Sequence, residues 1–196
     1  MGHLRLGTAF MAGAAGLLVA TSAPATADGH KPLLPNLVRK GSFEHPRVPL
    51  NMSAPFASIP GWKLAFGDAI EINAGDAAKK RQYVELDSDR SSGIYQQVPT
   101  ADHPLYRLEF YFSPRPGTSR AENVLVVKWH RRAVAVVSAD GRKLRRPKWK
   151  LYTFKVHATG KTTRLEFDDA GISDSVGTWI DGVRVTQWRG AKPPKH

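Results

Sequence analysis

The sequence has 196 residues, a formal net charge of +12 at pH 7 and no cysteine. A chain of this length fits one domain that buries a core without disulfide bonds. The absence of cysteine excludes thiol catalysis and thiolate metal sites. The excess of basic residues favours an anionic partner or surface.

The N-terminus has the pattern of an export signal. Arg5 gives a weakly positive start, Thr8 to Ala20 is an apolar run, and Ala25-Thr-Ala27 is a small-residue cleavage site. The apolar run is shorter than the roughly 20 residues that span a bilayer. We therefore predict a signal peptide over residues 1–27, a secreted, extracellular protein and no transmembrane segment; an uncleaved membrane anchor is the alternative.

Removal of that peptide takes away Arg5 and no acid, which leaves 28 basic and 17 acidic residues and a net charge of +11. We divide the remaining chain into a proline-containing leader (28–35), one folded domain (36–188) and a basic tail (189–196). Chain ends of this polar composition usually fray.

The folded part has the periodicity of β-strands. In Tyr106 to Ser113 the apolar residues at positions 106, 108, 110 and 112 share one face, and Arg107, Glu109 and Tyr111 share the other. Further short strands are indicated by alternating or β-branched residues, at 70–72, 84–86, 94–98, 124–129, 133–138, 152–156 and 165–167. No segment has helical periodicity over three turns. The pattern predicts an all-β protein, a two-sheet antiparallel sandwich of nine or ten short strands.

The two ends of the domain form a natural pair. Asn36 to Glu44 is expected to be an opening strand that turns at Gly41 and presents the carboxylate of Glu44. Trp179 to Val185 is rich in aromatic and β-branched residues, as a strand should be, and it carries Asp181. Its apolar residues do not keep a strict period of two, so Gly182 is expected to mark a bulge.

These two stretches resemble the first and last strands of the galactose-binding-like β-sandwiches, which include many carbohydrate-binding modules. The nearest match is the secreted bacterial branch of domain of unknown function 642, the choice-of-anchor group. The resemblance covers Asn36 to Trp188, through 59–62, 83–88, 93–98, 112–117, 162–167 and 180–183. It implies a jelly-roll fold and a structural Ca²⁺ held by Glu44 and Asp181 where the termini meet.

Calcium prefers carboxylate and carbonyl oxygens, and two clustered carboxylates repel one another without a cation. The competing interpretation is that Glu44 and Asp181 are exposed acids near turns, and both interpretations stay open here. Gly182 stands where members of that group often have a second polar residue, which removes one prospective ligand. The acids at 166, 168, 169 and 174 lack the regular spacing of a calcium loop, so a solvated loop is preferred there over a second cation site.

A sugar site needs a flat aromatic ring beside hydrogen-bonding groups, because a pyranose has an apolar face and a polar rim. Tyr111 fits this description, because Arg107 and Glu109 lie on the same predicted face and Arg115 follows in the next turn. Trp129 is a second candidate. Many tryptophans of a sandwich belong to its core, and Trp62 is assigned there.

Basic residues are concentrated in the segments 128–132 and 142–150. His130 and Arg131 stand where the choice-of-anchor group usually has a small polar turn, and Arg132 follows them. Guanidinium groups favour the paired oxygens of acidic groups. We predict that the two segments lie at one end of the sandwich and bind acidic glycans, with a solvated charged surface as the alternative.

The sequence has no Gly-x-Ser-x-Gly elbow, no His-Glu-x-x-His and no phosphate-binding glycine loop. We therefore predict a secreted, non-catalytic carbohydrate-binding module for cell-wall or extracellular polysaccharide, with no nucleic acid expected as a partner. An adhesion or structural module that binds protein, a charge-driven polyanion binder and a glycan hydrolase are the alternatives. Nothing in the sequence predicts an oligomeric state.

Overall fold

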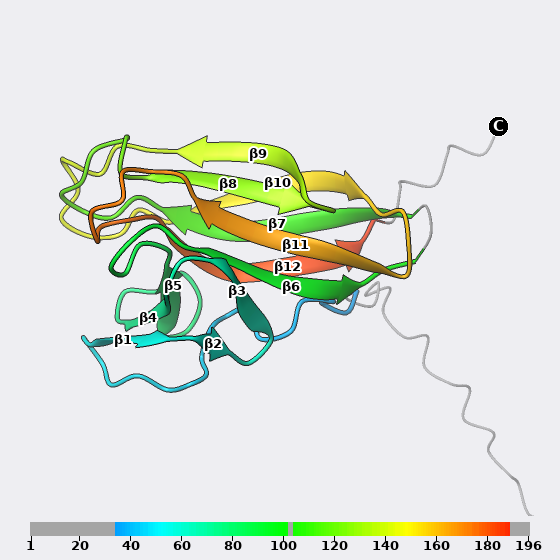
Figure 1. Cartoon of the computed structure of the whole chain (residues 1–196), viewed down its shortest axis with the longest axis horizontal. Helices are drawn as coiled ribbons and strands as arrows, with labels where there is room; N and C mark the ends of the chain where they lie inside the picture. The colour runs from blue at the N-terminus through cyan, green and yellow to red at the C-terminus, as the bar shows by residue number, and fades with distance from the viewer. Residues whose placement is uncertain (1–33, 102–103, 189–196) are drawn as a thin grey trace, which may run out of the picture. The chain divides into compact units, whose positions relative to one another are not determined.

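A computed structural model of the chain describes residues 34–101 and 104–188, and the predicted signal peptide, most of the leader and the basic tail lie outside them. The described residues form twelve strands and no helix (Figure 1). The strands are β1 (Ser53–Phe56), β2 (Ser58–Ile59), β3 (Trp62–Phe66), β4 (Ile70–Ala74), β5 (Gln82–Glu85), β6 (Gly93–Pro99), β7 (Leu105–Ser113), β8 (Val124–Trp129), β9 (Arg132–Ser138), β10 (Lys150–His157), β11 (Thr162–Asp169) and β12 (Trp179–Gln187). In these two ranges, no helix could cross a membrane.

The strands form two six-stranded antiparallel sheets. One, called the β12 sheet below, has the order β1-β4-β5-β12-β7-β10; the other, the β11 sheet, has the order β2-β3-β6-β11-β8-β9. Figure 1 shows the β11 sheet in front of the long strands of the β12 sheet. The predicted all-β, two-sheet antiparallel jelly-roll sandwich is confirmed.

The core lies between the sheets and consists of the inward halves of alternating strands. Leu108, Phe110 and Phe112 of β7 are buried, as the period of two predicted. The ring of Phe110 meets that of Phe167 on β11 edge-on, with centroids 5.1 Å apart. Trp62, which the sequence assigned to the core, is 1% exposed. The outward residues of β7 therefore face away from this core and are available for other contacts.

The opening segment is not the strand that the sequence predicted. Residues 36–44 contain no strand and form a turn at 39–42, because Lys40 (φ 53°) and Phe43 (φ 52°) adopt left-handed backbone conformations that an extended strand excludes. The partner was predicted correctly. The backbone N–H of Leu37 donates to the carbonyl of Val185, and that of Val183 donates to the carbonyl of Gly41. The segment thus lies along β12 without joining its sheet.

Candidate functional site

The closing strand is interrupted where the opening segment meets it. The pairing of β12 with β7 shifts register between Asp181 and Arg184, and Gly182 has a φ of +58°. This is the bulge that the sequence placed at Gly182. The side chain of Asn36 fixes the opening segment there, since its Oδ1 accepts the N–H of Val185 and its Nδ2 donates to the carbonyl of Val183.

Glu44 and Asp181 both face the loop that joins β4 to β5. Oε1 of Glu44 accepts the backbone N–H groups of Arg81 and Gln82, each at 3.0 Å. Oδ2 of Asp181 accepts the N–H of Lys79 at 2.6 Å. Burial, together with the nearby charge of Glu44, raises the pKa of Asp181 to about 7 in spite of these hydrogen bonds. The two acids are therefore close enough to repel, and Asp181 is not an exposed acid.

Among the described residues, no cationic side chain neutralises the charge of these two acids. Within residues 34–101 and 104–188, neither carboxylate forms an ion pair. The same ranges hold no group of three or more His, Cys, Asp or Glu placed to bind a metal ion. A cation between Glu44 and Asp181 would need backbone carbonyls or water for its other ligands.

Beside this pair, the outer face of the β12 sheet holds a cavity of about 520 Å³, a size typical of small-molecule sites. Tyr111 and Glu109 of β7 form its floor together with Leu151 of β10, which pairs with Tyr111. The opening segment and the β4–β5 loop contribute Lys40, Lys79 and Lys80, and β12 contributes Arg184; the remaining lining residues are Asn36, Val38, Gly41, Ser42, Gly182 and Val183. The cavity thus combines an aromatic ring with charged hydrogen-bonding groups.

Tyr111 is held in place from two sides. The ammonium of Lys79 lies 4.9 Å from the centroid of its ring, a cation–π contact. On β12, a Cβ at position 182 would come within 2.9 Å of Cδ2 of Tyr111. The ring can therefore occupy this position only because residue 182 is a glycine without a side chain.

Arg107 lies outside this cavity, near the N-terminal end of β7. Its guanidinium is 5.0 Å from the ring centroid of Trp188, and the ammonium of Lys155 is 5.2 Å from the same centroid. Arg107 and Tyr111 share a face, as predicted, but four residues of strand separate them by about 13 Å. Only Glu109 and Tyr111 of the predicted group line the cavity.

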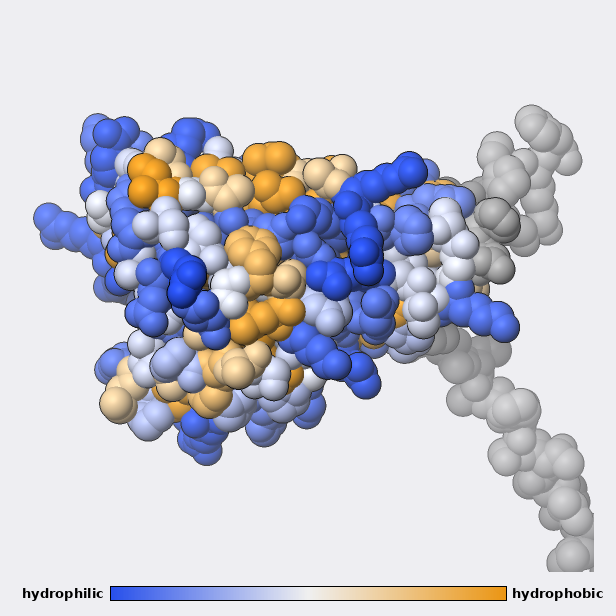
Figure 2. Space-filling view, viewed as in Figure 1, coloured by the Kyte–Doolittle hydropathy of each residue, from blue (hydrophilic) through white to orange (hydrophobic). Residues whose placement is uncertain are grey.

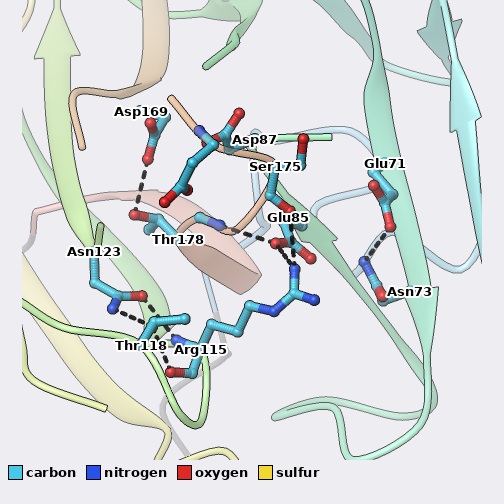
Figure 3. Close-up of polar contacts among 12 residues, drawn as sticks. Glu71, Asn73, Glu85, Asp87, Arg115, Thr118, Asn123, Asp169, Ser175 and Thr178 are labelled. Atoms are coloured by element: carbon cyan, nitrogen blue, oxygen red, sulfur yellow. Dashed lines mark hydrogen bonds and ion pairs between the residues drawn. The ribbon is translucent and has the colours of Figure 1, made fainter. Parts of the chain in front are cut away.

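Arg115 has a structural contact instead of a place beside Tyr111. Its guanidinium donates to Oε1 of Glu85 at 2.5 Å and to the carbonyl of Ser175 at 3.3 Å (Figure 3). Glu85 is 2% exposed, and burial raises its pKa to about 7 in spite of the arginine. Arg115 therefore compensates a buried acid, and it lies outside the cavity beside Tyr111.

Trp129 is also not available to a ligand. Its side chain is 3% exposed, and its indole N–H donates to the carbonyl of His157 at 2.9 Å. The sequence suggested a stacking surface because the flanking residues are basic, but position 129 is an inward position of β8. Arg131 and Arg132 are exposed at the turn that follows, where His130 and Arg131 both have positive φ.

The two basic segments do not lie at one end of the sandwich. Trp129 pairs with Arg132 next to the β8–β9 turn, whereas Ser138 at the far end of β9 pairs with Val124 and leads into the segment 142–150. Six residue steps of β9 separate the segments by about 20 Å. The prediction that the two segments form one binding surface is therefore wrong.

The acids of β11 are not a solvated loop. Glu166, Asp168 and Asp169 are each at most 6% exposed, because they belong to a strand and have partners. Lys128 of β8 forms ion pairs with Glu166 and Asp168. Asp169 accepts hydrogen bonds from the hydroxyl groups of Ser91 and Thr178, and burial raises its pKa to about 6. Figure 3 shows Asp169 and Thr178 beside the start of β12.

The outer face of the β11 sheet is a second surface with exposed rings. Apolar and strongly hydrophilic residues alternate on this side of the molecule (Figure 2). Phe66 is 43% exposed, and Tyr95 is covered by the guanidinium of Arg164, 3.5 Å from its ring centroid. A smaller cavity of about 310 Å³ lies beside Tyr95. This face is the alternative to the cavity at Tyr111 as a place for a ligand.

Sequence reasoning missed the lysines of the cavity. Lys40, Lys79 and Lys80 lie in turns with no repeated pattern, and they meet only because the opening segment and the β4–β5 loop both pack beside β12. The signal that could have found them is Lys-Lys-Arg at 79–81, directly before the strand that begins at Gln82.

No protein-family model matches the chain, so the resemblance to the choice-of-anchor group is not confirmed. A curated relative is the multifunctional-autoprocessing repeats-in-toxin of Vibrio vulnificus, 26% identical over 156 residues. The match covers 76% of this chain and only 3% of the length of that protein.

Two solved structures share the arrangement of strands. A family 61 carbohydrate-binding module in complex with β-1,4-galactotriose superposes with a TM-score of 0.53 at 15% identity, over 79% of this chain and 99% of that one. A second module, of family 16, gives a TM-score of 0.52 at 13% identity, over 77% of this chain and 99% of that one. At these identities the likeness establishes the fold alone: this chain has the β-sandwich of carbohydrate-binding modules.

Proposed function

We propose that this protein is a secreted, non-catalytic carbohydrate-binding module that holds a sugar unit of a cell-wall or extracellular polysaccharide in the cavity beside Tyr111. The observation that supports the proposal is the combination in that cavity of an aromatic ring with Glu109, Arg184 and lysine ammonium groups. The apolar face of a pyranose packs on a ring, and charged groups bind its hydroxyls. The fold shared with two carbohydrate-binding modules is consistent with this function.

Lys79 has a specific part in this proposal. Its ammonium covers the ring of Tyr111, and its backbone N–H bonds to Asp181. Because the side chain of Lys79 is exposed, it can move off the ring when a sugar packs there. Its ammonium then remains within reach of the sugar hydroxyls.

A structural Ca²⁺ between Glu44 and Asp181 is proposed as the cofactor. A divalent cation would remove the repulsion between the two carboxylates and keep the buried Asp181 ionised at neutral pH. Glu44 and Asp181 would hold it, with other oxygens from backbone or water. Since Asp181 also fixes the loop of Lys79, the cation would support the wall of the proposed sugar site.

The experiment that tests the function is a glycan array at two salt concentrations with the parent protein, Tyr111→Ala and Tyr95→Ala. Stacking survives salt that abolishes binding by surface charge. We expect Tyr111→Ala to lose glycan binding and Tyr95→Ala, the matched aromatic change on the other sheet, to retain it. If only Tyr95→Ala loses glycan binding, the sugar site lies on the β11 sheet. If the parent protein binds no glycan, the proposed function is wrong and a protein-binding adhesion module is the remaining interpretation.

A further inference from the structure

The charge of the cavity at Tyr111 is unbalanced. Four cationic side chains line it (Lys40, Lys79, Lys80 and Arg184), against the single carboxylate of Glu109. In the part of the chain that the structure describes, none of these five groups forms an ion pair. Four neighbouring ammonium and guanidinium groups repel one another, and an anion among them would relieve that repulsion.

Two of these lysines occupy positions at which lysine is unfavourable. Lys40 and Lys80 have left-handed backbones, with φ values of 53° and 63°. This conformation is unfavourable for side chains other than those of glycine, asparagine and aspartate. Both residues line the same cavity from different segments, the opening turn and the β4–β5 loop. Backbone strain of this kind is common in residues that hold a ligand.

The aromatic floor restricts what kind of anion fits. A small inorganic anion would use the cationic groups alone, whereas Tyr111 and Leu151 offer an apolar surface between them. A ligand that uses both needs an apolar face and a charged substituent on the same ring. A sugar with a carboxylate or sulfate group has both.

On the basis of the function proposed above, we propose that this cavity selects acidic sugar units. It binds their carboxylate or sulfate group with Lys40, Lys79, Lys80 and Arg184, while the sugar ring packs on Tyr111 and a hydroxyl donates to Glu109. The exposed basic segments at Arg131 and 142–150 contribute only long-range attraction, because they lie outside the cavity.

The test uses two pairs of polymers, each with a charged and an uncharged member on the same sugar backbone: polygalacturonate against its methyl ester, and dextran sulfate against dextran. Retention in affinity electrophoresis and calorimetry would be measured at two salt concentrations. The variant Lys79→Gln/Lys80→Gln removes two charges from the cavity. The control Arg131→Gln/Arg132→Gln removes two at the β8–β9 turn, where Arg131 has the same φ of 63° as Lys80.

We expect the parent to bind the acidic member of at least one pair about tenfold more tightly than the neutral member, as charge-assisted hydrogen bonds imply. The lysine variant should lose about tenfold more affinity for the acidic polymer than for its neutral counterpart, and the arginine control should stay within about twofold for both. The two pairs separate a carboxylate from a sulfate. Equal affinity for both members of both pairs, or an equal loss in the control, would overturn acidic selectivity while leaving sugar binding intact; no binding to any polymer would overturn the function itself.

Discussion

The ring of Tyr111 on β7 lies against the backbone of Gly182 on β12, at the one register shift between these strands. A Cβ on residue 182 would come within 2.9 Å of Cδ2 of Tyr111 and within 2.9 Å of Cγ of Lys79. The neighbouring residue in the chain is Asp181, whose carboxylate accepts the N–H of Lys79. The bulge therefore joins the proposed sugar site to the acidic pair at the chain ends, and a change at either one should affect the other.

Gly182→Ala should weaken ligand binding as well as stability. The left-handed φ of +58° costs alanine roughly 1–2 kcal/mol, and the new methyl group must also displace Tyr111 or Lys79. Gly117→Ala is the matched control, since Gly117 has a φ of +87° and open space around the added Cβ. In urea titrations both variants should lose stability, Gly182→Ala the more. Only Gly182→Ala should reduce glycan affinity. If the affinity of Gly182→Ala equals that of the parent, the bulge does not contribute to the sugar site.

Removal of calcium should lower the melting temperature. If the proposed cation binds at Glu44 and Asp181, a free concentration a hundredfold above its dissociation constant adds about 2.7 kcal/mol to the free energy of unfolding. A chelator should therefore lower the melting temperature of the parent by several degrees, and Asp181→Asn should no longer respond. Asp89→Asn, an exposed acid, is the control and should respond as the parent does. An unchanged parent melting curve with chelator would mean that these acids hold no structural metal.

The alternation of residues identified the strands because it reports which side chains face the core. Phe110 and Phe112 are buried and Tyr111 faces outward, as their spacing required. The turns of the opening segment could not be predicted in this way, since left-handed lysine and phenylalanine residues leave no periodic signal. The prediction for Trp129 was wrong for a different reason. Its basic neighbours suggested an exposed ring, but Trp129 occupies an inward position of β8 and is buried.

The site could be predicted only as far as it lies on one strand. Glu109 and Tyr111 are two residues apart on β7, so their shared face follows from the sequence. Lys40 and Lys79 come from segments about 40 residues apart that meet at the cavity through tertiary packing. The partner of Arg115, Glu85, is likewise 30 residues away, and nothing local distinguishes this arginine from one that binds a ligand.

Arg115→Met should destabilise the fold and leave glycan binding unchanged. It would leave Glu85 buried without its cationic partner, a change that costs about 3–5 kcal/mol for a fully buried pair and less here, because the Arg115 side chain is 34% exposed. Arg142→Met removes an exposed arginine that pairs with Asp140, and its unfolding curve should match that of the parent. Denaturation and glycan retention would be measured on both. If Arg115→Met folds but no longer binds glycan, Arg115 belongs to the binding site.

Asp181 should make the stability of the metal-free protein decrease as pH rises. Its pKa is about 7 in the folded protein, raised from the ordinary value of 3.8 by burial. Between these two values the folded state binds a proton that the unfolded state has lost, so the free energy of unfolding falls by up to about 1.4 kcal/mol per pH unit. Stability from this group is complete below about pH 4 and is lost as pH rises through 7.

Asp181→Asn isolates this contribution, because asparagine does not titrate and the other acids with a raised pKa remain in both proteins (Glu85, Asp87, Asp168 and Asp169). Urea denaturation in chelator at half-unit steps from pH 4 to pH 8 would compare the two proteins. The parent should lose stability relative to the variant up to about pH 7, and the difference should then level off. Added Ca²⁺ should flatten the curve of the parent alone, because a cation stabilises the ionised carboxylate. A parent that gains stability relative to the variant over this range would show that Asp181 is already ionised in the folded protein at acidic pH.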